Sequence, residues 1–242
     1  MSQTSKQYQC KTQDGRMPTF GAAPASHLHP NHENHEGIVL GIGSIVPRWD
    51  VIQQPNRKLQ YFVRKDTFPS GDAAQLAASV LQEAADEWNK LNLGLTITST
   101  NDQGAANFYL VYKTSSDPTD TTLAMAFFPN EANQDVLVFG FAFDQENKPI
   151  MKNVFMHELG HVLGLRHEFA ITGDSNKGLG PEGEGAVQFM TTNYNSIMSY
   201  NFPPTIQQTD KDGIQAFYKL KNGFKIGNSP VTDYLPQIRK KN

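Results

Sequence analysis

The stretch HELGHVLGLRH, residues 157–167, follows the pattern H-E-x-x-H-x-x-G-x-x-H. Residues four apart on an α-helix share a face and lie about 6 Å apart along the axis, so His157 and His161 can direct two imidazole nitrogens at one metal ion. Gly164 can adopt a positive φ, end the helix and turn the chain back, which would bring His167 to the same ion. Three protein nitrogens and one open position are typical of a catalytic zinc site rather than a closed structural one.

Glu158 lies beside these predicted ligands without being one of them. Its carboxylate can accept a proton from a water activated by the metal, which is the role of a general base. A single histidine is more often a core residue than a ligand, but here three histidines stand in register with a glutamate and a glycine. The motif therefore predicts a hydrolytic zinc centre with Glu158 as its base.

The motif resembles that of the metzincin metalloendopeptidases. This family has a second signature, a methionine turn beneath the zinc, and the sequence SIMSY at residues 196–200 is similar to it. The resemblance implies that Met198 supports the metal site without binding the metal. It also implies one of two roles for Tyr200: an extra zinc ligand that swings away, with a hydroxyl that assists the oxyanion, or a wall of the substrate site. One catalytic Zn²⁺ and cleavage of protein or peptide substrates follow as expectations.

The resemblance extends over about residues 57–220 and implies an α+β fold. Its expected parts are a twisted, mostly parallel five-stranded sheet with an antiparallel edge strand, two long helices, and a smaller C-terminal subdomain ending in a helix. Hydrophobic periodicity predicts an amphipathic helix over 72–89, opened by a capping box of Asp72 and Gln75. Strands are expected at 59–63, 93–99, 107–112 and 135–143, and the last helix at 210–220.

The segment 123–128 is similar to the edge strand above the cleft in matrixin-type metzincins. Such an edge can pair with an extended peptide, so the candidate substrate-binding residues are Leu123, Ala124, Met125 and Ala126. The region 135–143 has no histidine, and we expect no second structural zinc there. Glu168 is instead an astacin-like feature, able to pair with a freed N-terminus. These mixed affinities do not assign the chain to one subfamily.

The first 45 residues differ from the rest, because glycine, proline, asparagine and histidine dominate 18–37 with little periodicity. We expect an extended segment over 1–45, followed by a single catalytic domain over 46–242 with its cleft near 165–170. The segment 1–45 is either a plain tail or a prosegment that blocks the zinc. In the second case Cys10 is one candidate ligand, since thiolate binds zinc strongly, and another N-terminal residue is the alternative.

Composition narrows the classes of partner. The net charge of −3 and the absence of a basic run longer than 239–241 argue against a nucleic-acid partner, and no apolar run has the ~18 residues that a membrane helix needs. One cysteine excludes an internal disulfide framework. We expect a monomer. The polar start, residues 1–6, does not resemble a secretory signal, whereas the family resemblance favours secretion, so the compartment stays open.

Two other functions stay open. A zinc-binding scaffold without turnover would not need Glu158, which is present. A metallohydrolase acting on a non-peptide substrate would not need the edge strand at 123–128. The long segment 169–195, rich in glycine and asparagine, is expected to shape one side of the cleft.

Overall fold

The computed structural model describes residues 37–117, 119–175, 178–183, 185–199 and 201–240. Its largest sheet has five strands in the order β4-β3-β5-β7-β6. Their bounds are β3 Arg57–Val63, β4 Leu95–Ser99, β5 Phe108–Lys113, β6 Ala124–Met125 and β7 Val136–Phe139. The strands β4, β3, β5 and β7 pair in parallel, and β6 pairs antiparallel with β7 at the edge of the sheet. The predicted α+β class and sheet are confirmed.

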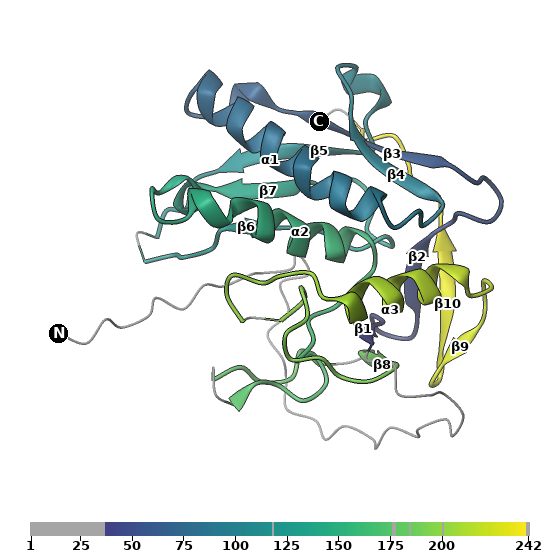
Figure 1. Ribbon diagram of the computed structural model, residues 1–242. Helices are drawn as coiled ribbons and strands as arrows, with labels where there is room; N and C mark the ends of the chain where they lie inside the picture. The colour runs from purple at the N-terminus through teal and green to yellow at the C-terminus, as the bar shows by residue number, and fades with distance from the viewer. Residues whose placement is uncertain (1–36, 118, 176–177, 184, 200, 241–242) are drawn as a thin grey trace.

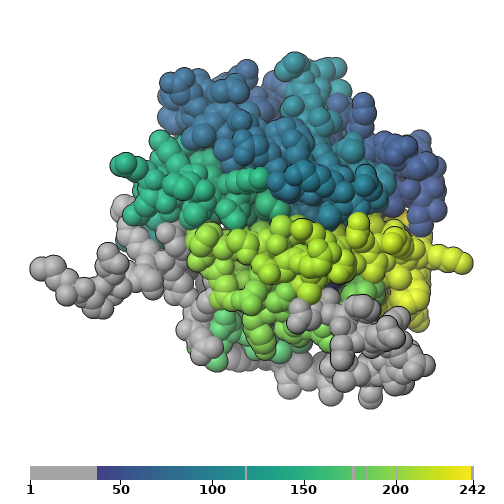
Figure 2. All heavy atoms as spheres, in the orientation of Figure 1, coloured from purple at the N-terminus to yellow at the C-terminus, as the bar shows by residue number. Residues whose placement is uncertain are grey.

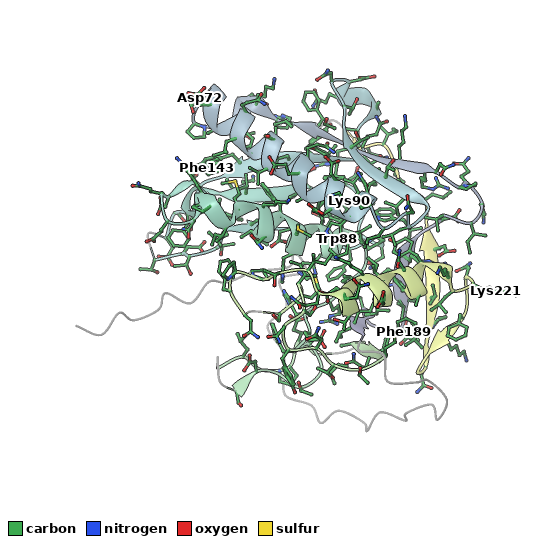
Figure 3. The ribbon with its side chains drawn as sticks, in the orientation of Figure 1. Asp72, Trp88, Lys90, Phe143, Phe189 and Lys221 are labelled. Carbon is green, nitrogen blue, oxygen red and sulfur yellow. The ribbon has the colours of Figure 1, made fainter. Side chains whose placement is uncertain are left out.

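Two helices, α1 (Gly71–Asn89) and α2 (Met151–Val162), pack together along one face of this sheet (Figure 1). Apolar positions repeat along α1 every three or four residues, and the inner ones, such as Leu81 and Trp88, are buried. The Trp88 indole N–H donates to Met156 O of α2 at 3.0 Å. Trp88 lies in the last turn of α1 (Figure 3). This bond fixes α2, and with it the motif, against α1.

The predicted capping box at the start of α1 is wrong. Ser70 is the N-cap, in an extended conformation, and its hydroxyl accepts a hydrogen bond from Ala73 N–H at 3.1 Å. Asp72 instead lies in the first turn, where a negative charge favours the helix dipole. The N-cap therefore lies two residues earlier than the S/T/D/N-x-x-E/Q spacing indicates.

A second region holds α3 (Gln208–Lys219) and two small sheets. In one, β1 (Ile38–Leu40) pairs antiparallel with β8 (Val187–Phe189). In the other, β10 (Ser229–Tyr234) lies between β2 (Val46–Trp49), parallel to it, and β9 (Lys225–Ile226), antiparallel. Figure 2 shows the α3 region packed directly beneath α1 and α2 on the visible face. The chain thus continues past the last predicted helix into two strands that the sequence analysis does not predict.

Three segments differ from the expected ones. β7 ends at Phe139 because 140–143 form a 3-10 helix, and only Ala124–Met125 of the predicted strand 123–128 pairs with β7. β1 is a buried strand, although it falls in 1–45, for which the sequence predicts an extended segment.

The other 3-10 helices described are 65–67, 103–105 and 148–150. Among the described residues, no helix is both long enough and apolar enough to cross a membrane.

Candidate metal centre

The end of α2 is a glycine turn that carries the third histidine of the motif. Gly164 has a φ of 96°, and the N–H of Leu165 reaches back to Gly160 O at 2.9 Å, as in a Schellman motif. A Cβ at position 164 would lie 2.6 Å from Pro47 O, so only glycine fits. The turn reverses the chain and brings His167 back to α2, as the sequence predicts.

The three histidine rings converge on one point. Nε2 of His167 lies 3.2 Å from Nε2 of His161 and 3.1 Å from Nε2 of His157. Nitrogens that ligate a tetrahedral zinc at about 2.0–2.1 Å lie roughly 3.3 Å apart, so the spacing fits a single ion. All three histidines are buried, and among the described residues they form a cluster of possible metal ligands.

The outer nitrogens of two rings fix their tautomers. Nδ1–H of His157 donates to Ile197 O, and Nδ1–H of His161 donates to Leu165 O, both at 2.8 Å. Because a carbonyl oxygen only accepts, Nδ1 carries the proton and Nε2 keeps its lone pair. Burial is the main reason that the pKa of His157 falls to about 3 and that of His161 lies well below its ordinary value. Neutral rings whose lone pairs face one another fit a cation, and these residues therefore fit zinc.

The third ring is held by a carboxylate from the loop that follows. Nδ1–H of His167 donates to Glu182 Oε1, and Arg166 Nη2 donates to Glu182 Oε2 at 3.0 Å. Arg166 is itself buried and donates from Nη1 to Gly41 O at 3.1 Å. Burial tends to raise the pKa of Glu182, but the neighbouring His167 and Arg166 outweigh it and lower that pKa to about 2. Glu182 is therefore an ionised acceptor.

Aromatic rings line the same centre. The Phe169 ring stacks on His167 with centroids 5.0 Å apart and planes 8° apart, while the Phe128 ring meets His161 edge-on at 5.3 Å. Glu158 follows His157 on α2 and is 1% exposed. The carboxylate and the nitrogen cluster are thus both buried, and electrostatic interactions are stronger there than in water.

The turn that contains Met198 lies against α2 and holds one ligand. A Cβ on Gly160 would collide with Sδ of Met198, so the sulfur occupies the space that this glycine leaves. Ile197 supplies the carbonyl for His157, as described above. Asp210 of α3 in turn accepts from Ile197 N–H at 2.8 Å and from the Ser196 hydroxyl at 2.6 Å. The start of α3 therefore sets the position of this turn.

The structure brings together five residues named from the sequence: His157, Glu158, His161, His167 and Met198. Tyr200 lies outside the described residues, and so does the segment 1–36 that contains Cys10. Leu123, Ala124 and Ala126 are buried, and Met125 is partly exposed. β6 packs beside α2, so these residues lie near the motif.

Glu168, the astacin-like feature, is also buried. Its Oε1 accepts from Asn193 N–H at 2.7 Å, and its own N–H donates to Met198 O at 3.1 Å. Burial raises the pKa of Glu168 to about 7. The expected pairing with a freed N-terminus concerns a part of the chain outside the described residues.

Two residues of the site escaped the sequence analysis. Glu182 stands fifteen positions after His167 in a glycine-rich loop, where no period or motif marks it. Asp210 had one usable signal: it stands at the third position of α3, where an acid can form a capping box, and it does so with Gln207.

A comparison with known protein families agrees with this geometry. A family model described as dual-action HEIGH metallo-peptidase matches residues 56–212. The chain reads HELGH at 157–161, so Leu159 stands where the name of the family has isoleucine. No curated protein matches the chain in sequence.

Solved structures are also similar to the chain, and three of them are as follows. High choriolytic enzyme 1, a hatching enzyme zinc-protease from Oryzias latipes (medaka fish), is 11% identical, with a TM-score of 0.44 over 72% of this chain and 95% of that one. Archaemetzincin from Methanopyrus kandleri is 12% identical, with a TM-score of 0.34 over 71% and 100%. Metalloproteinase-II from Bacteroides fragilis is 11% identical, with a TM-score of 0.33 over 75% and 58%.

Proposed function

This chain belongs to the dual-action HEIGH metallo-peptidase family, and from that premise we propose that it is a metzincin-type endopeptidase with Glu158 as general base. Membership makes it a zinc metallopeptidase that acts on protein or peptide substrates through one catalytic zinc ion. The observation that carries the proposal is the convergence of three histidine Nε2 atoms on one point, at the helix that also carries the buried Glu158.

His157, His161 and His167 would hold the zinc. A zinc ion bound there supplies a Lewis acid that polarises a scissile carbonyl and lowers the pKa of a water to near 7. Glu158 then accepts the proton of the attacking water and returns it to the leaving amine. The burial of Glu158 favours this transfer, because it limits the access of bulk water to the carboxylate.

The remaining assignments are part of the same proposal. Met198 belongs to a methionine turn that holds the metal ligands in place. The packing of its sulfur against Gly160 of α2 is the evidence for this role. The Tyr200 hydroxyl assists the oxyanion. A substrate strand pairs along Leu123–Ala126, a proposal that rests on the edge position of β6 beside α2. The catalytic domain includes 37–45 together with 46–242, has its cleft near 165–170, and acts as a monomer.

The test is a digest of a denatured protein by the zinc-loaded chain and its Glu158→Gln variant. Glu83→Gln, an exposed glutamate on α1, is the matched control. We expect Glu158→Gln to lose at least ~100-fold in rate, the scale of general-base catalysis, and to keep its zinc. Internal fragments separate an endopeptidase from an exopeptidase.

Latency is tested in the same assay. Cys10→Ser and a chain that begins at Gly37, which keeps every described element, would gain activity if the N-terminal segment blocks the site. Full activity in Glu158→Gln would overturn the assigned base. Silence of all zinc-loaded forms would favour the scaffold without turnover.

A further inference from the structure

We propose that Glu182 is a positioning residue for the metal, which fixes His167 as a ligand by holding its outer nitrogen. The other two ligands are oriented by backbone carbonyls from segments packed against α2. His167 alone among the three is oriented by a side chain, from a loop residue fifteen positions further on. The inference concerns zinc binding and does not depend on the proposed proteolysis.

The chemistry of the contact decides the tautomer. Both Glu182 oxygens accept, one from Nδ1–H of His167 and the other from the Arg166 guanidinium, so this contact keeps the proton of His167 on Nδ1 and leaves the Nε2 lone pair for the metal. A negative charge on the outer side also makes the imidazole a stronger donor to a cation. Neither effect needs Glu182 to touch the metal, which is why we describe it as positioning rather than catalytic.

Arg166 prevents the carboxylate from turning away. Its guanidinium donates to Glu182 Oε2 from Nη2 at 3.0 Å and from Nε at 3.3 Å, while its other nitrogen is held by Gly41 O. The Arg166 and Glu182 side chains are 8% and 22% exposed, so water screens the pair weakly. The N–H of Glu182 also donates to Ala170 O at 2.9 Å. Both ends of the residue are therefore fixed relative to His167.

Glutamine should not replace this residue, although it has the same shape. Both carboxylate oxygens of Glu182 face donors, one on His167 and two on Arg166. A glutamine would offer one oxygen and one NH₂. If the oxygen faces Arg166, the NH₂ points at Nδ1 and favours the tautomer that protonates Nε2, which cannot bind a cation.

The experiment measures Zn²⁺ affinity by competition with a chromophoric chelator, for the full chain and for Glu182→Ala and Glu182→Gln. The absorption of bound Co²⁺ reports the ligand geometry. Unfolding of the zinc-free protein reports loop anchoring. Arg166→Gln is the matched control, because it removes the same ion pair but leaves a carboxylate facing His167.

We expect Zn²⁺ affinity to fall about 10–100-fold in both Glu182 variants, the range for outer partners of metal ligands. Their Co²⁺ spectra should change, and Arg166→Gln should lose less affinity than either. A zinc-free stability like that of Arg166→Gln would show that loop anchoring does not explain the loss. Affinity within about threefold of wild type in Glu182→Ala, or full affinity in Glu182→Gln, would overturn the proposal.

Discussion

The turn at Gly164 sets where the third ligand lies. Its φ of 96° is in a region that side chains with a Cβ rarely adopt, and the 2.6 Å approach of a Cβ to Pro47 O adds a clash with backbone rather than with a flexible side chain. Gly164→Ala must therefore shift either β2 or the turn. We expect a loss of about 2–4 kcal/mol in unfolding free energy, combining left-handed strain with overpacking, and weaker zinc binding.

Chemical denaturation and zinc competition check this prediction. The control is Gly223→Ala, where φ is 80° but a Cβ meets nothing within 4 Å. The Gly223→Ala variant has the strain of a positive φ without a clash. Its unfolding free energy should therefore fall by about 1 kcal/mol, and its zinc affinity should not change. Equal effects of the two substitutions would contradict the role given to the close approach at Pro47.

Single residues were predictable where local geometry fixes them. His157 and His161 lie four apart on one helix, and Gly164 must turn the chain, so their spacing alone indicates a shared ion. Glu182 meets His167 because a loop folds back, and a loop has no period that relates the two positions. Its contact depends on tertiary structure, which explains why the motif did not reveal it.

Elements were predicted best where periodicity is long. The helix expected at 72–89 is observed at 71–89, since nineteen residues carry five turns of apolar repeats. β1 and β8 have three residues each, too few to establish alternation, and their pairing joins segments about 150 positions apart. β7 is shorter than expected because its apolar run continues into a 3-10 helix, which composition does not distinguish from a strand.

The start of α3 gives a prediction for that element. Asp210 is fully buried and accepts from Ser196, Ile197 and Gln207, so it ties α3 to the turn that holds His157. Asp210→Ala leaves these buried donors without an acceptor, and we expect a loss of about 2–4 kcal/mol in unfolding free energy. Urea denaturation of the variant and the wild type measures it. A loss below about 1 kcal/mol would mean that water replaces the carboxylate.

The same carboxyl gives a pH dependence. Burial, its largest cause, raises the pKa of Asp210 in the folded protein, against the hydrogen bonds that lower it. In the unfolded chain the value is about 3.9. Between these two values the folded state binds more protons, so the contribution of Asp210 to stability is full below the lower one and declines as pH rises through the higher one.

Asp210→Asn does not titrate and isolates this contribution. The unfolding free energy of wild type minus that of Asp210→Asn should fall as pH rises from about 4. The measurement uses zinc-free protein, so that proton release by the ligands on zinc binding does not enter. A difference that grows with pH would show that the hydrogen bonds outweigh burial.

At the scale of the whole molecule, the strand pairings that follow α3 could not be predicted from local patterns in the sequence. Buried Arg48 of β2 donates to Asp233 of β10 at 2.8 Å and to Phe217 O at the end of α3, also at 2.8 Å. It thus connects three elements, and the first of these contacts joins positions 185 apart. Local sequence patterns predict neither the pairing of β10 with β2 nor the contacts of this buried arginine, because both depend on tertiary packing.

Removal of zinc should act on one part of the molecule rather than on all of it. The ion would join α2 to His167, which holds the loop through Glu182, while His157 holds the 196–199 turn through Ile197 O. At zinc about 1,000-fold above Kd, binding contributes ~4 kcal/mol, so chelation should lower Tm by about 8–16 °C in a chain of this length. Scanning calorimetry with and without chelator measures the shift.

Hydrogen exchange shows where that stability lies. Amides in 163–175 and 185–199 should exchange faster after chelation, because these segments lose the link to α2. Amides of α1, β3 and β5 should not change, since Trp88 of α1 holds α2 through Met156 O whether or not the ion is bound. Uniform acceleration across both regions would mean that the zinc stabilises the whole core. In that case the five-stranded sheet and α1 would not be stable independently of the metal. The proposed order, in which zinc fixes only the loops after α2, would then be wrong.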